Sequence, residues 1–79
     1  MKHLQIFYPD ADCVLQVKRY FAALKHTTFN IYNDDDMGRI DIDTEEKMSI
    51  NYHDTHITIF IGPAILLLKY NQFECISIR

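Results

Sequence analysis

The apolar residues of this chain follow two different periods. Residues 3–8 alternate between the two faces of an extended chain, which predicts a short strand. Residues 11–25 place apolar side chains three and four positions apart, which is the spacing of an amphipathic helix. Asp10 or Asp12 is suited to cap this helix, because a carboxylate accepts hydrogen bonds from the free amides of the first turn. The residues expected to face the core are Leu4, Ile6 and Tyr8 in the strand and Val14, Val17, Phe21 and Leu24 in the helix.

From residue 29 onward the period is that of strands. The expected strands span residues 29–32, 39–44, 47–53, 56–61, 64–70 and 73–78. Gly38 ends the loop before the second of these strands and is free to take a positive φ. Gly62 and Pro63 separate the fourth strand from the fifth, and a turn at residues 71–72 is expected to join the last two strands as a hairpin. Connections this short do not allow crossovers, so the strands should pair antiparallel.

These elements predict one α+β domain over residues 1–79, in the order β-α-β-β-β-β-β. The expected architecture is one amphipathic helix packed on a curved, mostly antiparallel sheet of about five to seven short strands. A helix of about four turns is ~20–25 Å long and covers about three strands that lie ~4.8 Å apart. Part of the sheet, including Phe7, Phe60 and some of residues 65–68, is therefore expected to be less covered. Either the sheet curls on itself, or this face meets a partner, for which a second copy of the chain is one candidate.

The composition of the chain excludes several functions. It has 79 residues, is 48% hydrophobic and 24% charged, and carries a formal charge of −3, which is typical of a globular protein. Its eight Lys and Arg residues are scattered, so we expect no direct binding to nucleic acid or to an anionic membrane. The apolar run at residues 62–68 is too short to span a bilayer, and the N-terminus has no signal-peptide pattern. We interpret Cys13 and Cys75 as free buried thiols in a reducing compartment, which predicts a cytoplasmic protein without membrane insertion.

Seven of the eleven carboxylates of the chain fall between residues 34 and 46. Because side chains alternate along a strand, Asp41 and Asp43 should share one face, and the acidic group should form a line about 20 Å long. Such a line can steer toward a basic protein surface, and its ~6–7 Å spacing along the strand resembles that of DNA phosphates. The alternatives are a solvated edge strand whose charges prevent aggregation, and weak cation binding. The candidate partner-binding residues are Asp34, Asp35, Asp36, Asp41, Asp43, Glu45 and Glu46.

Two segments carry metal-ligating residues. When Gly38 is aligned with the glycine of an EF-hand loop, Met37 and Thr44 fall at ligand positions, so we expect no EF-hand. In the second segment, a turn at residues 54–55 would place His53 and His56 opposite each other with their Cβ atoms ~5 Å apart. Two imidazoles at that distance can hold zinc or move protons, although the local sequence offers no third ligand. The other interpretation is a pair of hydrated histidines at the end of a hairpin.

Two short segments resemble a motif of known enzymes. The segment from His56 to Thr58 resembles the His-x-Thr element of the two-histidine phosphoesterase family, and the segment from His26 to Thr28 resembles a partial second copy. In that family the two elements lie on neighbouring strands. The resemblance implies that the two histidines would act as acid and base on a phosphodiester, and that the two threonines would hold its phosphate.

The sequence contains no other catalytic pattern. Ser49 and Ser77 lie inside alternating strands without a strand-turn-helix elbow, and no glycine-rich phosphate loop is present. We therefore expect a protein that is not an enzyme and that has no catalytic residue, metal or cofactor.

The function expected first is that of a small protein-binding inhibitor or modulator. It would dock its acidic strand and the adjoining aromatic residues on a basic surface of a larger host protein, such as a surface that normally binds nucleic acid. Short acidic chains of this kind are often encoded by phages or mobile elements. The alternatives are a small hydrolase or metal-binding protein that uses His53 and His56, and a self-assembling structural subunit.

Overall fold

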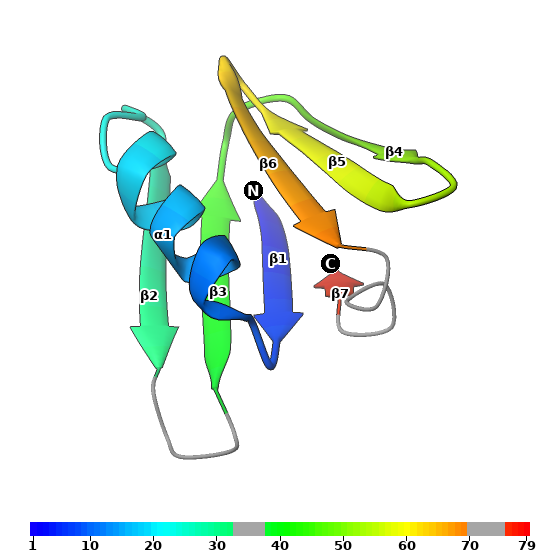
Figure 1. Cartoon of the computed structure of the whole chain (residues 1–79). Coiled ribbons are helices and arrows are strands. Elements are labelled where there is room, and N and C mark those ends of the chain that lie inside the picture. The colour runs from blue at the N-terminus through cyan, green and yellow to red at the C-terminus, as the bar shows by residue number, and fades with distance from the viewer. Residues whose placement is uncertain (33–37, 70–75) are drawn as a thin grey trace.

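The computed structural model describes residues 1–32, 38–69 and 76–79 of the chain. Within these ranges it contains one helix and seven strands (Figure 1). In chain order the elements are β1 (Lys2–Phe7), α1 (Ala11–Tyr20), β2 (Thr27–Tyr32), β3 (Arg39–Thr44), β4 (Met48–Tyr52), β5 (His56–Ile61), β6 (Ala64–Lys69) and β7 (Ile76–Ile78). The predicted α+β class is confirmed.

The strands form two antiparallel sheets rather than one curved sheet. The first has four strands in the order β2-β3-β1-β7, and the second has three strands in the order β4-β5-β6. In Figure 1, α1 lies across β2 and β3, whereas the sheet that contains β6 is set at an angle to the four-stranded sheet. The division has a simple cause. A helix of 10 residues is only ~15 Å long and cannot cover every strand, so the second sheet folds over and completes the cover.

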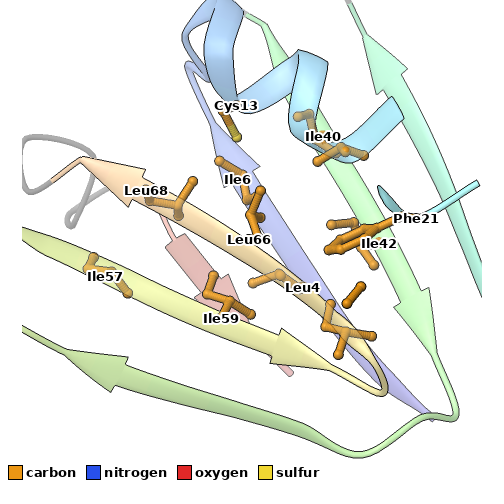
Figure 2. Packing of buried hydrophobic residues seen from close by; sticks show 13 residues of the cluster. Leu4, Ile6, Cys13, Phe21, Ile40, Ile42, Ile57, Ile59, Leu66 and Leu68 are labelled. Carbon is orange, nitrogen blue, oxygen red and sulfur yellow. The ribbon is translucent and has the colours of Figure 1, made fainter. Parts of the chain in front are cut away.

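One hydrophobic core joins the two sheets and the helix (Figure 2). It consists of inward-facing side chains from β1, β3, β5 and β6 and from α1 with its C-cap residue, all of which are at most 8% exposed. The strand alternation predicts most of these positions, because every second residue of a half-buried strand faces the core. The core residues are Leu4, Ile6, Cys13, Val17, Phe21, Ile40, Ile42, Ile57, Ile59, Ile61, Ala64, Leu66 and Leu68.

The helix begins where the sequence predicts and ends earlier. The carboxylate of Asp10 accepts a 2.8 Å hydrogen bond from the backbone N–H of Cys13, which caps the first turn. The helix ends at Tyr20, with Phe21 as its C-cap, instead of continuing to about residue 25. The chain must reverse within the next few residues, because β2 starts at Thr27, and Thr27 pairs with the last residue of β3.

The predicted hairpin between the last two strands is wrong. β6 pairs with β5, whereas β7 pairs with β1 in the other sheet, where Ile76 lies opposite Ile6 and Ile78 opposite Leu4. Alternation along residues 64–70 and 73–78 specifies which side chains face inward, but it does not specify the neighbouring strand. Without β7, the edge of β1 that faces away from β3 would be a row of unpaired backbone groups. β7 pairs with this edge.

Two backbone positions also differ from expectation. Tyr8 has a φ of 55° and is 56% exposed, so it ends β1 instead of facing the core. Its backbone N–H donates to the carbonyl of Gly38 at 2.8 Å. Among the described glycines, positive φ occurs at Gly62 and not at Gly38. Gly62 and Pro63 form the two-residue turn between β5 and β6, where a positive φ followed by the fixed negative φ of proline suits a type II′ hairpin.

Candidate functional site

The four-stranded sheet has one face that no described element covers, and we call it the outer face. Its core-facing side chains Leu4, Ile6, Ile40 and Ile42 are fully buried on the opposite side. The strand register places the outward side chains in rows, because residues opposite each other in antiparallel strands share a face. The rows are Thr28–Asp43–His3, Asn30–Asp41–Gln5–Ser77 and Tyr32–Arg39–Phe7.

Asp43 contacts a histidine that sequence reasoning did not consider. Its carboxylate is hydrogen-bonded to Nδ1 of His3, which lies opposite it on β1. The two side chains are 38% and 32% exposed, so both reach solvent. The contact with His3 orients the Asp43 carboxylate, which remains partly exposed on the outer face.

Asp41 is more fully paired. Its Oδ1 lies 2.9 Å from Nε of Arg39, and it accepts a 3.2 Å hydrogen bond from Nε2 of Gln5. The Nε–H of Arg39 makes no aligned hydrogen bond within the described part of the chain, so its contact with Asp41 is an ion pair set by distance. The guanidinium also lies over the ring of Tyr32, 4.7 Å from its centroid. With its side chain only 14% exposed, Asp41 is largely compensated by the protein itself.

The two glutamates after β3 lie away from these rows. The backbone N–H of Glu45 donates to the carbonyl of His26 at 2.9 Å, and its side chain is exposed. The backbone N–H of Glu46 donates to Oγ1 of Thr44 at 2.9 Å. The carboxylate of Glu46 lies against Gly62, where an added Cβ would be 3.1 Å from its Cδ. Glu46 therefore faces the turn of the other sheet.

The structure thus separates the acidic residues that the sequence predicts as one line. Asp41 and Asp43 share the outer face, Glu45 lies beyond the end of their strand, and Glu46 packs elsewhere. Asp34, Asp35 and Asp36 lie outside the described residues. The edge-strand interpretation is wrong for Asp41 and Asp43, because β3 is an interior strand that pairs with both β1 and β2.

The histidine pair lies where the sequence predicts it. His53 and His56 flank the turn between β4 and β5, and the N–H of His53 donates to the carbonyl of His56 at 2.9 Å. The two rings are stacked, with centroids 4.3 Å apart and an interplanar angle of 21°. Nδ1 of His56 also lies 3.0 Å from Oγ1 of Thr55. The described residues contain no group of three His, Cys, Asp or Glu side chains that could hold a metal ion.

The two His-x-Thr segments do not form the arrangement that their resemblance implies. His26 precedes β2 in the four-stranded sheet, whereas His56 begins β5 in the three-stranded sheet. The two segments therefore do not lie on neighbouring strands. Thr28 is exposed on the outer face, but Thr58 is only 9% exposed. This part of the prediction is wrong, because the motif does not determine the sheet to which each copy belongs.

Cys13 is confirmed as a buried free thiol. It is 1% exposed and projects from α1 into the core (Figure 2). Burial raises the pKa of its thiol to about 12, and the nearby negative charges of Asp10 and Asp12 act in the same direction. The thiolate is the nucleophilic form, and the raised pKa keeps Cys13 in its thiol form. Cys13 is therefore a packing residue of the core. Cys75 lies outside the described residues.

A second exposed surface lies between α1 and the three-stranded sheet. It is a groove of about 660 Å³ that the sequence alone did not reveal. The groove is mostly apolar, and its walls come from the second half of α1, the residues after it, and the start of β6. Its lining residues are Gln16, Tyr20, Ala23, Leu24, Pro63, Ala64, Ile65 and Leu67. The only sequence signal for it was the apolar run at residues 64–68, of which Leu66 and Leu68 are buried while Ile65 and Leu67 are about half exposed.

Comparisons of the chain with models of protein families, with characterised proteins and with solved structures found no match. Within the described residues, no helix is both long and apolar enough to cross a membrane.

Proposed function

We propose that this chain is a non-enzymatic protein-binding domain that docks the outer face of its four-stranded sheet on a basic surface of a larger protein. The observation that carries the proposal is the uncovered outer face, on which the charged Asp43 is held outward beside His3. The small size and acidic character of the chain are typical of inhibitors or modulators of host proteins, and a cytoplasmic site of action suits its buried thiol, Cys13.

The charges of this face support recognition centred on one end of β3. Asp41 forms an ion pair with Arg39, so it contributes less to the electrostatic field outside the protein than the sequence suggests. Asp43 and the exposed Glu45 remain for lysine or arginine side chains of a partner. Tyr32, which is 42% exposed and lies two rows from Asp43 on the same face, adds an aromatic surface of the kind enriched at interfaces.

The position of the acidic residues on an interior strand also supports this role. β3 has hydrogen-bonded neighbours on both sides, so its outward side chains stand on a rigid platform. The domain therefore loses little conformational entropy when a partner binds. The partner that we favour is a protein whose basic surface normally binds nucleic acid, because such a surface presents several cations at once.

The test is affinity capture from a host lysate, followed by titration of the captured protein. Asp43→Asn removes one charge from the outer face, and Asp54→Asn removes one exposed charge from the turn between β4 and β5 as a matched control. We expect Asp43→Asn to weaken binding about tenfold and Asp54→Asn to leave it nearly unchanged. Equal affinity of the native protein and Asp43→Asn at physiological salt would remove the outer face as the recognition surface.

A second candidate function is metal binding, because the rings of His53 and His56 are stacked at 4.3 Å at the end of a hairpin. Rotation of both rings about their side-chain bonds would direct two imidazole nitrogens to one ion. Equilibrium dialysis with Zn²⁺ tests this candidate. Stoichiometric zinc that is lost in His56→Ala supports it, and no bound zinc in the native protein excludes it.

A further inference from the structure

β6 has an unusual neighbour along one of its edges. It pairs with β5 on one side, and no described strand pairs with it on the other. On that second side the side-chain amide of Gln16 makes two hydrogen bonds to the backbone of Leu67. Nε2 donates to the Leu67 carbonyl at 2.7 Å, and Oε1 accepts from the Leu67 N–H at 2.9 Å. One side-chain amide of the helix therefore makes both hydrogen bonds that one residue of an adjacent strand would make.

The backbone of Ile65 points to the same edge and has no such partner among residues 1–32, 38–69 and 76–79. In an antiparallel strand the backbone groups of residues two positions apart face the same neighbour, so Ile65 follows Leu67. The start of the hairpin agrees with this assignment, because the N–H of Gly62 donates to the carbonyl of Lys47 on β4, at 2.9 Å. Within the described part of the chain, neither the N–H nor the carbonyl of Ile65 makes a hydrogen bond.

This free donor and acceptor lie beside the apolar groove. Ile65 lines the groove together with Tyr20 and Leu24 from the opposite wall. The side chains of Tyr20, Ile65 and Leu67 are 46%, 50% and 49% exposed. A main-chain hydrogen-bonding edge next to an apolar groove is the combination that strand-addition sites present to peptides, with the edge giving affinity and the groove choosing side chains.

We propose that an extended peptide segment of another protein adds to the free edge of β6. One apolar peptide residue exchanges both main-chain hydrogen bonds with Ile65, and its side chain, which lies on the same face as that of Ile65, enters the groove between Tyr20 and Leu24. Gln16 holds the place of the next pairing residue at Leu67 and is displaced when the peptide continues along the strand. The site belongs to the three-stranded sheet, so it is independent of the outer face proposed above.

A peptide suits this edge better than a second copy of the chain. A second copy would bring its own β6, whose Leu67 groups are already bonded to its own Gln16. A symmetric antiparallel pairing centred on Ile65 would also place Pro63 opposite Leu67, and proline has no N–H to donate. A peptide with all its backbone groups free meets neither obstacle.

The test uses the full chain and the blocked peptide acetyl-Lys-Val-Thr-Val-Thr-Val-Lys-amide. Fluorescence anisotropy measures affinity, and hydrogen exchange by NMR follows the Ile65 amide. We expect saturable binding with exchange at Ile65 slowed about tenfold or more, while the amide of Leu66, which faces β5, changes little. The same peptide with N-methylated valines should bind about tenfold more weakly, because it keeps the side chains and loses main-chain donors.

Variants of the chain separate the possible outcomes. Ile65→Pro removes the outward N–H together with the half-exposed Ile65 side chain, and it should weaken binding about tenfold, while the fold is kept because edge strands accept proline. Gln16→Ala should strengthen peptide binding severalfold, because it frees the backbone groups of Leu67. Asp43→Asn should leave peptide binding unchanged, whether or not it weakens docking of the outer face.

Three results would overturn strand addition at β6. They are absence of peptide binding to both the native chain and Gln16→Ala, equal affinity for the N-methylated peptide, and weaker binding by Gln16→Ala. If Ile65→Pro does not fold, the comparison of the two peptides still decides.

Discussion

The two sheets of this domain share a core but present different groups on their outer sides. The four-stranded sheet shows polar side chains that are hydrogen-bonded to one another, as in Asp43 with His3 and Asp41 with Gln5. The three-stranded sheet shows apolar side chains and, among the residues that the structure describes, a backbone at Ile65 that makes no hydrogen bond. The first surface suits recognition of charge, and the second suits recognition of an extended chain.

The difference follows from the number of neighbours that each strand has. β1 and β3 are interior strands, so their backbone groups are used within the sheet and only their side chains remain for a partner. β6 is an edge strand, so its backbone remains available wherever Gln16 does not reach. The same packing thus leaves two kinds of unused binding capacity on one small domain.

The largest expected effect tests whether the two sheets really depend on one core. Leu4 of β1 and Leu66 of β6 are both 0% exposed in the same cluster. Leu4→Ala and Leu66→Ala should each lower the free energy of unfolding by about 2–5 kcal/mol in a single urea transition. Leu67→Ala in the same strand, 49% exposed, should cost less than about 1 kcal/mol. Separate transitions for the two sheets would contradict a shared core.

The next effect tests the burial of Cys13, which α1 contributes to the shared core. The pKa of Cys13 is raised from 9.0 to about 12 by burial. An unfolded chain therefore releases the thiol proton above pH 9 while the folded chain keeps it, so stability is full below pH 9 and falls as pH rises toward 12.

The predicted loss is about 1.4 kcal/mol per pH unit in that window. Urea unfolding at several alkaline pH values measures it in a Cys75→Ser background, so that Cys13 is the only thiol. A Cys13→Ala variant is the reference, because it shares every tyrosine and lysine titration and lacks this one. Identical pH dependence of the two proteins would show that Cys13 is accessible to water.

A smaller effect distinguishes the turns of the two sheets. Gly62 has a φ of 53°, and an added Cβ would lie 3.1–3.2 Å from the Glu46 carboxylate. Gly62→Ala should lower the free energy of unfolding by about 1–2 kcal/mol. At Gly38, before β3, an added Cβ would have its nearest contact at 3.6 Å, so Gly38→Ala should change stability by less than about 0.5 kcal/mol. Thermal unfolding of the two variants measures both losses of stability. Equal losses would contradict the expected difference between the two glycines.

The smallest effect concerns the polar pair of the outer face. His3 and Asp43 are both about one-third exposed, so their interaction is screened by solvent. A double-mutant cycle with His3→Gln and Asp43→Asn should give a coupling of about 0.2–1 kcal/mol that decreases with added salt. A coupling well above this range would mean that the pair holds the sheet together, and Asp43 would then be less free for a partner.

The local pattern of the sequence predicted the elements well. The strands at residues 39–44 and 56–61 have the predicted bounds, and the helix begins at the predicted Ala11. The placement of His53 opposite His56 was also predicted, because a two-residue turn fixes which residues lie opposite each other. In each case the residues that determine the structure lie within a few positions of one another.

The candidate sites were less predictable because their residues lie far apart along the chain. His3 meets Asp43 across 40 positions, and Gln16 meets Leu67 across 51. No periodicity within a segment indicates that Gln16 will reach a strand edge. Whether Asp41 and Asp43 lie on an edge or an interior strand depends on β1 and β2, and the groove depends on the angle between α1 and β6.

The sequence by itself determined the class of elements, their approximate bounds and the faces that they bury, because the alternation of apolar and polar side chains is a local property. The tertiary structure decided that the strands form two sheets, that β7 joins β1, and which carboxylates and backbone groups of the described residues are paired. These outcomes depend on competition among many strand edges for the same hydrogen-bonding partners, and that competition is settled only when the whole chain packs around one core.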